Sequence, residues 1–379
     1  MTQIYLIRHA EAEGNLYRRM HGQYDSGVTE LGRRQIAALG RRFQDIHLDA
    51  VYASDLCRTM ETAAVLCRQK GLPLRTDPRL REIHVGVWED VPFGNALAEW
   101  PEAMVQFIRD PDAWHLEGAE TYGDVSRRGI EALRDIGEKN PGRTVAVAAH
   151  RVIISAMLEH LFPETVGENG SANTAVSLLT YDAGVFSLKY CHNADHLTGS
   201  ERRAHLGGTD RDMEFVPLGD AVEEYIRYRK DAWQVVYGDL RGFDGSGFWL
   251  DAQRTVGPDP EALMVGRLGG KTVGLIQLSP DRDKDKGVGY IPFLYLKEAC
   301  RHQGLGIQLI GHAVSFYRRL GRSKLQLSVA PTNEHALAFY DKFGFTQVKR
   351  QRGRFGHLLL MEKDIAMPAG PKDIEIIRG

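Results

Sequence analysis

The first residues with the types and spacing to do chemistry are Arg8 and His9, at the end of an apolar run over residues 4–7. A histidine ring nitrogen can attack phosphorus to form a phosphohistidine, and a guanidinium can hold phosphoryl oxygens through paired hydrogen bonds. Open α/β sheets bind ligands at the carboxyl ends of their strands, where this pair would lie. The pair predicts a nucleophile beside an anion clamp, although Arg-His alone more often marks a surface histidine after a buried strand.

Three later stretches supply partners for that chemistry. Arg58 follows a strand-like run, 50–53, at the start of a helix, where free N–H groups and the helix dipole favour anions. Glu82 lies in a partly apolar stretch and suits a proton donor to a leaving alkoxide. His150 ends a buried strand over 144–149, and a second imidazole at the same sheet edge can stabilise the charge of the transition state.

Together these residues resemble a known family, the histidine phosphatase superfamily, branch 1, over about residues 1–197. The motifs in the family's order and spacing are Arg8-His9, Asn15, Thr29-Glu30-Leu31-Gly32, Ser54-Asp55-Leu56, Arg58-Thr59, Leu80-Arg81-Glu82-Ile83 and His150. The resemblance implies a three-layer α/β/α phosphoglycerate mutase-like fold, with His9 as phosphorylated nucleophile and Glu82 as proton donor. The residues that it implies in phosphate binding are Arg8, Arg58, His150 and, through a hydrogen bond, Asn15.

Three positions depart from the family's pattern, because Ala10, Asp90 and Arg151 stand where it commonly has glycine. Arg151 adds positive charge near the pocket, and we expect it either to contact a substrate anion or to face solvent at a helix start. The stretch from Glu82 to Glu120 is short for a mutase of this family. Hydrolysis by water is therefore favoured over return of the phosphoryl group to a product.

The second half of the chain has a centre of its own. A strand-like run, 288–296, leads into Arg301-His302-Gln303-Gly304-Leu305-Gly306, and a helix with an apolar stripe follows. Glycines at such a junction let backbone N–H groups approach a diphosphate. Three further features follow this loop: Asn333, the helix that reaches Tyr340 and the turn Lys342-Phe343-Gly344-Phe345. With them, the chain resembles the GNAT-type N-acetyltransferases over about residues 213–365.

The second resemblance implies an α+β domain with acetyl-CoA as the acetyl donor. The cofactor-binding residues that it implies are Arg301, His302, Gln303, Gly304, Leu305, Gly306 and Ile307 at the pyrophosphate, the main chain of Leu294 and Leu296 at the pantetheine arm, and Asn333 and Tyr340. Tyr340 would protonate the departing CoA thiolate, with core packing beside Phe339 as the alternative. The central strand offers no carboxylate at 290–292, so the base that accepts the amine's proton is left open.

The elements that must position the first set of residues alternate in type. The expected strands are 3–8, 50–53, 144–149, 175–182 and 185–191, and the expected helices lie near 29–43, 58–70, 122–138 and 151–161. Such alternation predicts a mostly parallel sheet covered on both faces. An aromatic excursion over 85–123 is expected either to cover the phosphate pocket as a lid or simply to pack, and His21 and Tyr24 are further candidates for the pocket.

A chain of 379 residues is long enough for two cores. A polar, glycine-containing stretch without periodicity indicates a linker between them. We therefore predict a histidine phosphatase domain at 1–197, a linker at 198–212, an acetyltransferase domain at 213–365 and a C-terminal tail at 366–379. No internal repeat relates the halves, which favours a fusion of unlike domains.

Composition limits the class of partners. A net charge of −2 and a pI near 6.7 argue against nonspecific nucleic-acid binding as the main task. The first residues lack a signal peptide's pattern and no run has membrane-spanning length, so we expect a cytoplasmic enzyme. The four cysteines show no metal-ligand spacing, and neither chemistry requires a metal. The expected partners are a small phosphorylated metabolite, a small amine and acetyl-CoA, and a homodimer is left open.

Three functions are compatible with these observations. The first is a bifunctional enzyme whose two sites act on small metabolites of one pathway. The second is an active acetyltransferase with a catalytically silent, phosphate-binding regulatory domain, which the departures at Ala10 and Arg151 motivate. The third is a regulator that modifies proteins. The intact set of Arg8, His9 and Glu82, with their pocket partners, favours the first.

Overall fold

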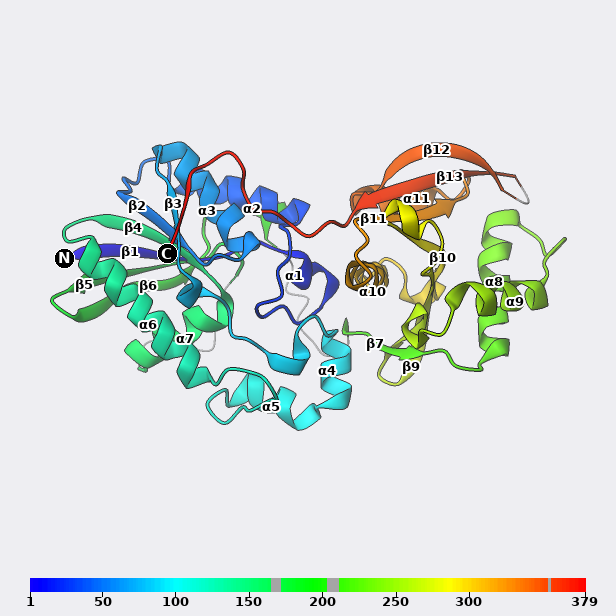
Figure 1. Ribbon diagram of the computed structural model, residues 1–379, viewed down its shortest axis with the longest axis horizontal. Helices are drawn as coiled ribbons and strands as arrows, with labels where there is room; N and C mark the ends of the chain where they lie inside the picture. Colours follow the sequence, from blue (N-terminus) through cyan, green and yellow to red (C-terminus); the bar gives the residue numbers. More distant parts are fainter. Residues whose placement is uncertain (165–171, 203–210, 354–355) are drawn as a thin grey trace. The chain divides into compact units, whose positions relative to one another are not determined.

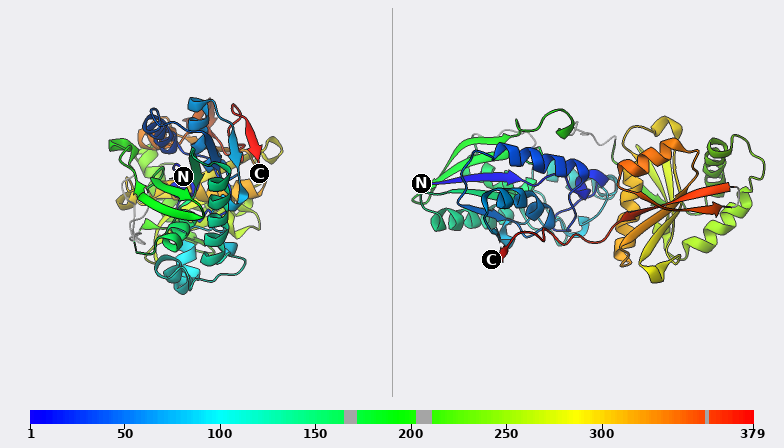
Figure 2. Two further views of the ribbon diagram at one scale, coloured as in Figure 1. Left: turned by 90° about the vertical axis from the view of Figure 1, so that its left-hand side faces the viewer. Right: turned by 90° about the horizontal axis from the view of Figure 1, so that it is seen from above.

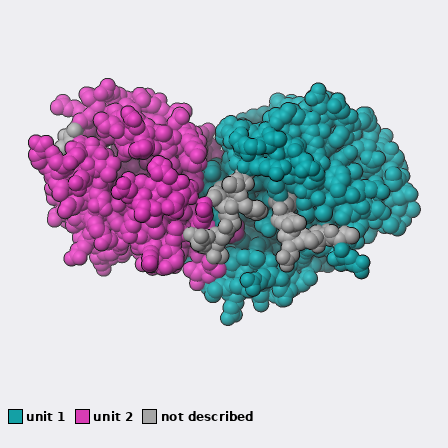
Figure 3. Space-filling model, turned by 180° about the vertical axis from the view of Figure 1, so that it is seen from behind, with its two compact units in different colours: residues 1–91, 99–206, 368–379 teal, residues 92–98, 207–367 magenta. Residues whose placement is uncertain are grey.

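The computed structural model describes residues 1–164, 172–202, 211–353 and 356–379. The chain forms two compact units (Figure 3). Unit 1 comprises Met1–Val91, Glu99–Leu206 and Pro368–Gly379, and unit 2 comprises Pro92–Ala98 and Gly207–Met367. Each unit has its own seven-stranded sheet and its own hydrophobic core.

The sheet of unit 1 has the strand order β14-β3-β2-β4-β1-β5-β6 (Figure 1). Its strands are β1 (Thr2–Arg8), β2 (Ala50–Ala53), β3 (Leu74–Thr76), β4 (Thr144–Ala149), β5 (Val176–Asp182), β6 (Val185–Asn193) and β14 (Ile376–Arg378). The strands from β14 to β1 pair in parallel, whereas β5 and β6 pair antiparallel. The predicted mostly parallel sheet is confirmed, and β3 and β14 are additional strands.

Helices cover both faces of this sheet, as predicted (Figure 1). Helices α2 (Glu30–Arg42) and α3 (Cys57–Lys70) pack on one face, and α6 (Tyr122–Lys139) and α7 (Arg151–Leu161) pack on the other. Strand β4 buries five of its six residues because it is covered from both sides. Parallel pairing of β1 with β4 sets Arg8 opposite Ala149, so His9 and His150, which follow them, lie at one sheet edge.

The aromatic excursion of unit 1 folds on itself. Trp88 and Trp114 are fully buried with ring centres 5.6 Å apart. Phe107, from α5 (Pro101–Arg109), packs edge-on against both. Residues of this stretch thus form a small aromatic core, which supports the packing alternative over the lid.

Part of the same excursion belongs to unit 2. Helix α4 (Phe93–Glu99) lies almost entirely in the segment Pro92–Ala98, which clusters with that unit. The Asn95 side chain exchanges two hydrogen bonds of 2.8 Å with the main chain of Phe215. The predicted division into 1–197 and 213–365 therefore differs from the compact units at this segment, because a side-chain-to-strand contact of this kind leaves no mark in the sequence.

The end of the chain returns to unit 1. Strand β14 pairs in parallel with β3, with Ile376 opposite Leu74, and it lies beside the strands of unit 1 in Figures 1 and 2. Ile374 and Ile376 pack against the core of unit 1. The stretch predicted as a tail, 366–379, thus contributes an edge strand to the first sheet, and three residues are too few for periodicity to reveal it.

The sheet of unit 2 has the order β12-β13-β11-β10-β9-β8-β7. Its strands are β7 (Glu214–Pro217), β8 (Leu263–Leu268), β9 (Lys271–Ser279), β10 (Val288–Leu296), β11 (Lys324–Val329), β12 (Thr346–Gly353) and β13 (Gly356–Asp364). Helices α8 (Val222–Tyr237) and α9 (Gly245–Val256) pack together, with α9 on β9, and α10 (Gly306–Arg319) contacts β9, β10 and β11. Figure 1 shows these helices on opposite faces of the sheet.

Strands β10 and β11 form a parallel pair that ends early. The pairing covers Val288–Ile291 of β10, although that strand continues to Leu296. The register of β10 against β9 shifts between Tyr290 and Phe293, around Pro292, which has no N–H to donate. Main-chain groups of β10 beyond Ile291 therefore lie past the end of its ladder with β11.

The predicted linker at 198–212 is only partly within the described residues. Its start forms a short 3₁₀ turn, Gly199–Glu201, and residues 203–210 lie outside the described ranges. The remaining helices include α1 (Glu13–Tyr17) and α11 (Glu334–Lys342). None of the described helices has the length and apolar character needed to cross a bilayer.

Candidate active sites

His9 follows the carboxyl end of β1 and is 6% exposed. Its Nδ1 lies 2.7 Å from the main-chain oxygen of Ala10. A carbonyl oxygen can only accept, so Nδ1 donates its proton and Nε2 keeps its lone pair. Burial, followed by the charges of Arg58 and Arg8, holds the pKa of His9 well below its ordinary value of 6.5. The ring is thus neutral and nucleophilic at Nε2, as phosphoryl attack requires.

His150 caps the start of α7 and is fully buried. Arg58 Nε donates to His150 Nδ1 over 3.2 Å, so the proton of the neutral ring resides on Nε2. Burial and the charge of Arg58 also keep the pKa of His150 well below 6.5. Within the described residues Nε2 has no hydrogen-bond partner. With ring centres 5.2 Å apart, His9 and His150 combine a nucleophilic nitrogen and a donor nitrogen in one pocket.

Arg58, the second residue of α3, is buried and joins the pocket to the loop after the nucleophile. Nη1 donates to Tyr24 O over 3.0 Å, and Nη2 donates to Gly22 O over 2.6 Å. Nη1 carries two N–H groups, and the described residues accept only one of them. Arg58 therefore orients His150 and retains one N–H for an anion.

Arg8 and Arg151 add positive charge at the same edge. Burial and then the neighbouring charge of Arg151 lower the pKa of Arg8 to about 9. Arg151 is exposed at the first position of α7, as the solvent-facing alternative predicted. Its charge nevertheless acts on Arg8 in the pocket. Two neutral imidazoles with three guanidinium groups give the pocket an excess of positive charge, which favours a phosphoryl group.

Asn15 has a local structural role in addition to any role in the pocket. Its Oδ1 accepts a hydrogen bond of 3.1 Å from Ala12 N at the start of α1. Asn173 Nδ2 donates to His9 O over 3.0 Å and approaches Asn15 Oδ1 at 3.5 Å. Asn15 and Asn173 therefore hold the main chain around the nucleophile.

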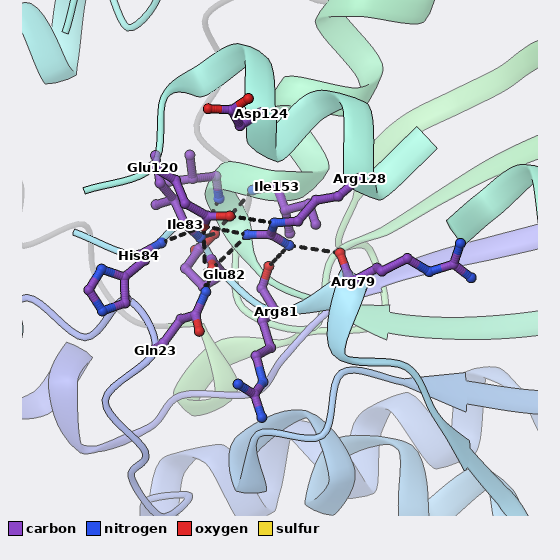
Figure 4. A network of polar contacts seen from close by, with 12 residues as sticks. Gln23, Arg79, Arg81, Glu82, Ile83, His84, Glu120, Asp124, Arg128 and Ile153 are labelled. Carbon is purple, nitrogen blue, oxygen red and sulfur yellow. Dashed lines mark hydrogen bonds and ion pairs between the residues drawn. The ribbon is translucent and has the colours of Figure 1, made fainter. Parts of the chain in front are cut away.

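Glu82 lies close to the start of α7. Oε1 accepts from Ile153 N over 3.0 Å (Figure 4), and Oε2 accepts from Val152 N over 3.1 Å. The side chain is 7% exposed. This setting is more polar than the apolar one that the sequence predicted, because tertiary packing brings the free N–H groups of a helix start to the carboxylate. Oε1 also accepts from Ile83 N over 3.1 Å, so the second lone pair of Oε2 is the position left for a transferable proton.

Arg128 of α6 fixes the main chain that carries Glu82. Nη1 donates to Arg79 O and Arg81 O over 2.7 and 2.6 Å, and Nη2 donates to Glu82 O over 2.9 Å (Figure 4). Glu120 pairs with the same guanidinium at 2.8 Å. Arg128 is thus a positioning residue for the candidate proton donor.

Asp90 accounts for one departure from the family's glycines. It adopts a φ of +59°, a region that favours glycine, and its Oδ1 lies 2.7 Å from Arg19 Nε and 3.1 Å from His21 Nε2. His21 O in turn lies 3.4 Å from Arg58 Nη2. The carboxylate therefore holds the loop after the nucleophile. Glu89 does the same through hydrogen bonds of 2.7–2.8 Å from the N–H groups of residues 23 and 24.

The candidate cofactor loop of unit 2 precedes α10. His302 and Gly304 have φ values of +61° and +76°, so the chain turns sharply before the helix begins at Gly306. Arg301 Nε donates to Leu296 O over 3.0 Å, and Gln303 Nε2 donates to Ala299 O over 2.8 Å. These two side chains hold the loop, while Leu305 and Ile307 are buried and anchor the helix start.

Leu294 and Leu296 pair with β9 on one side, in the part of β10 beyond the ladder with β11. Asn333 caps α11, with its Oδ1 accepting from Ala336 N over 3.2 Å. Main-chain groups on β10 and at the start of α10 thus fit an extended ligand with a diphosphate end. The Asn333 side chain is engaged by its own helix.

Tyr340 is 8% exposed, and its ring packs against Phe339 and Phe345. No described residue shares a hydrogen bond with its hydroxyl. Burial raises the pKa of Tyr340, which keeps the phenol protonated as a proton donor requires. The residue therefore packs in the core and also retains a donor group. No three His, Cys, Asp or Glu side chains of the described ranges are grouped as metal ligands.

Comparison with known families assigns residues 4–194, half of the chain, to the histidine phosphatase superfamily (branch 1). The chain belongs to that superfamily. Residues 222–345 match the acetyltransferase (GNAT) family. This histidine phosphatase is therefore fused to a GNAT domain, as the sequence predicted.

Individual proteins also resemble the first unit of this chain. The probable phosphoglycerate mutase GpmB of Yersinia pestis (strain Pestoides F) is 32% identical over 161 residues, which are 42% of this chain and 75% of the relative. Among solved structures, YhfR of Bacillus stearothermophilus is 30% identical, with a TM-score of 0.50. That match covers 52% of this chain and 99% of YhfR.

Sequence reasoning about this histidine phosphatase missed its positioning residues. Arg128 stands in the sequence as one cation beside Arg127 on an amphipathic helix, and nothing local shows which of the two is half-buried and holds the main chain near Glu82. Glu120 and Asn173 carry no motif either. Asp90 stands where the family commonly has glycine, and this departure is the one signal that the sequence offers for a positioning residue.

Proposed function

We propose that the chain is a bifunctional enzyme. Unit 1 would hydrolyse a phosphate monoester through a phosphohistidine at His9, and unit 2 would transfer an acetyl group from acetyl-CoA to an amine. The observation that carries the first activity is the pair of tautomers in the pocket, a lone pair on His9 Nε2 beside a donor on His150 Nε2. The short stretch between Glu82 and Glu120 supports hydrolysis rather than the mutase reaction in the name of GpmB.

The phosphatase reaction takes place in two steps. His9 Nε2 forms a bond to phosphorus as the ester P–O bond breaks, and Glu82 gives a proton to the leaving alkoxide. His150, with Arg8 and Arg58, stabilises the charge on the phosphoryl oxygens. Water then attacks phosphorus, its proton passes to Glu82, and the P–N bond breaks to release phosphate and neutral His9.

In unit 2, acetyl-CoA supplies an activated thioester when it is bound. Main-chain N–H groups at the start of α10 would hold its diphosphate, and main-chain groups of Leu294 and Leu296 would pair with its pantetheine arm. Asn333 lies at the start of the neighbouring helix, within the family's cofactor motif. Tyr340 would give its phenolic proton to the departing sulfur.

The fusion motivates one further proposal, that both sites act on one pathway. A metabolite with a phosphate ester and a primary amine, such as an amino-sugar or amino-alcohol phosphate, would be dephosphorylated in unit 1 and acetylated in unit 2. Acetylation could also come first. A cytoplasmic location is part of this proposal, since both reactions use small intracellular metabolites.

The test measures phosphate release and acetyl-CoA consumption in the same wells, across a panel of small phosphate esters and amines. His9→Ala is expected to abolish phosphate release and leave acetyl transfer unchanged. Tyr340→Phe is expected to lower acetyl transfer by about 10²-fold or more and leave phosphate release unchanged. Each variant thereby serves as the control for the other unit.

Two outcomes would contradict parts of the proposal. If no ester is hydrolysed above the His9→Ala background while acetylation proceeds, unit 1 is a phosphate-binding regulatory module. If only phosphorylated or unmodified proteins are turned over, the enzyme is a regulator of proteins rather than a metabolic enzyme. Unrelated substrate profiles at the two sites would refute the shared pathway alone.

A further inference from the structure

A cation on α8 packs against the strand that would hold acetyl-CoA. The guanidinium carbon of Arg229 lies 3.9 Å from the ring centre of Phe293, 4.9 Å from that of Phe248 and 5.3 Å from that of Tyr225. Phe293 belongs to β10, two residues beyond the last pair of its ladder with β11. Arg229 therefore lies at the part of β10 that the proposed function assigns to the acetyl donor.

Two hydrogen bonds hold the guanidinium in place. Nε donates to Tyr225 Oη, and Nη2 donates to Gln277 Oε1, both over 2.8 Å. Tyr225 and Gln277 are fully buried, and Gln277 is anchored in turn by a hydrogen bond of 3.0 Å to Thr255 Oγ1. The cation is thus oriented by neutral partners before any ligand binds.

Arg229 forms no ion pair within the described part of the chain, although the charge of Asp251 acts on it from farther away. No carboxylate there lies within 4.0 Å of its guanidinium, and no described residue accepts from Nη1. The side chain is intermediate in exposure, so a ligand can reach it. Burial lowers the pKa of Arg229. The aromatic rings stabilise the cation in part, but an anion would do so more fully.

We propose that Arg229 binds a carboxylate on the acetyl acceptor, so that unit 2 acetylates amines of the amino-acid type. The inference rests on the proposed acetyltransferase function and names its acceptor class. A carboxylate fits better than a phosphate monoester, because one guanidinium neutralises one negative charge. A phosphate dianion would keep a second, unneutralised negative charge among the aromatic rings. A hydroxy amino acid would keep this carboxylate after unit 1 had removed a phosphate from its hydroxyl.

The experiment compares matched acceptors on the full-length protein. Each amino acid in the panel is paired with its carboxamide, which keeps the amine and side chain but removes the charge. Ethanolamine and phosphoethanolamine form a second pair, which tests a phosphate in the same way. Thiol release from acetyl-CoA gives kcat and KM for each acceptor, and calorimetric titration measures acetyl-CoA binding separately.

We expect the wild-type protein to prefer the amino acid over its carboxamide by about 30-fold in kcat/KM, as for a charge-assisted hydrogen bond to a desolvated cation. Arg229→Gln should bring that ratio close to one by raising the KM of the amino acid, with the carboxamide little changed. Arg229→Lys should restore part of the preference. Arg227→Gln is the control, because Arg227 is an exposed cation on the same helix that pairs with Glu224.

The outcomes separate this inference from the proposed function. If acetyl-CoA binds and amines are acetylated without preference for a carboxylate, or with preference for phosphoethanolamine, the inference is overturned and the acetyltransferase proposal stands. An equal loss on both members of each pair in Arg229→Gln would show a structural role and also overturn it. Failure to bind acetyl-CoA would refute the proposed function and this inference together.

Discussion

At the scale of residues, the chemistry of the phosphatase pocket depends on which nitrogen carries each proton. The Ala10 carbonyl and the Arg58 guanidinium impose opposite tautomers on His9 and His150. Both rings are buried beside guanidinium groups, so both stay neutral where an exposed imidazole would begin to charge. The pocket is therefore prepared for a phosphoryl anion, which supplies the missing negative charge.

This arrangement predicts how stability depends on pH. The folded state holds His9 and His150 neutral, whereas the unfolded chain binds a proton at each below about pH 6.5. Because the unfolded state then binds more protons, the free energy of unfolding of unit 1 should decrease as the pH falls below 6.5, by about 1.4 kcal/mol per pH unit for each ring. Denaturant unfolding curves recorded between pH 5 and 8 would measure this pH dependence.

Variants identify the source of that pH dependence. His150→Asn removes one titrating ring and should reduce the slope of the free energy of unfolding against pH. His115→Asn removes an exposed histidine and should leave that slope unchanged. Vanadate or phosphate at saturating concentration should also reduce the slope, because a bound anion favours the charged rings. An identical slope in wild type and His150→Asn would contradict the assignment.

At the scale of elements, the start of helix α7 places His150 and also binds the Glu82 carboxylate. Helix α7 begins with His150 as its cap and donates its free N–H groups to Glu82. Helix α6 contributes Arg128, which donates to the carbonyl groups of Arg81 and of Glu82 itself. The candidate proton donor is therefore held by groups on two helices that follow it in the chain.

We expect Arg128→Gln to lower phosphatase kcat/KM by about 10–100-fold on alkyl phosphates, which need a proton at the leaving oxygen. With p-nitrophenyl phosphate the loss should be much smaller, because that leaving group departs without protonation. Steady-state kinetics on both esters measure the difference. Arg127→Gln is the control, since Arg127 lies exposed on the same helix and pairs with Asp124. Equal losses on the two esters would indicate a general structural defect instead.

At the scale of the whole molecule, the chain enters unit 2 twice, at Pro92–Ala98 and at Gly207–Met367, and each time returns to unit 1. The edge strand β14 therefore reaches β3 only after the whole GNAT domain has been made. Ile376 packs against the core of unit 1, whereas its neighbour Ile377 is exposed. The last residues thus belong to the stability of the phosphatase unit.

Ile376→Ala should lower the free energy of unfolding of unit 1 by about 1–2 kcal/mol, because the side chain is only partly buried. Its melting temperature should fall by several degrees, roughly 2–4 °C per kcal/mol for a unit of this size. Ile377→Ala, the matched control, should change little. Calorimetry follows the transition of each unit, and an equal shift for both variants would argue against β14 as a structural strand.

Much of the fold was predictable because it follows from local patterns. The buried strand over residues 144–149 and the helix over 151–161 have the predicted bounds, and so does the strand over 288–296. Apolar periodicity and capping residues mark such elements clearly. The three-residue strands β3 and β14 were missed, because three residues carry no periodicity and their pairing joins distant parts of the chain.

The sequence by itself determined both families and the identity of the candidate groups, because motifs such as Arg8-His9 and the loop before α10 combine residue type with fixed local spacing. Only the tertiary structure decided the tautomers of the two histidines, the helix-start setting of Glu82, the hydrogen bonds from Arg128 and the placement of Arg229 among aromatic rings. Each depends on burial and on hydrogen bonds between residues far apart in the chain, which no local pattern encodes.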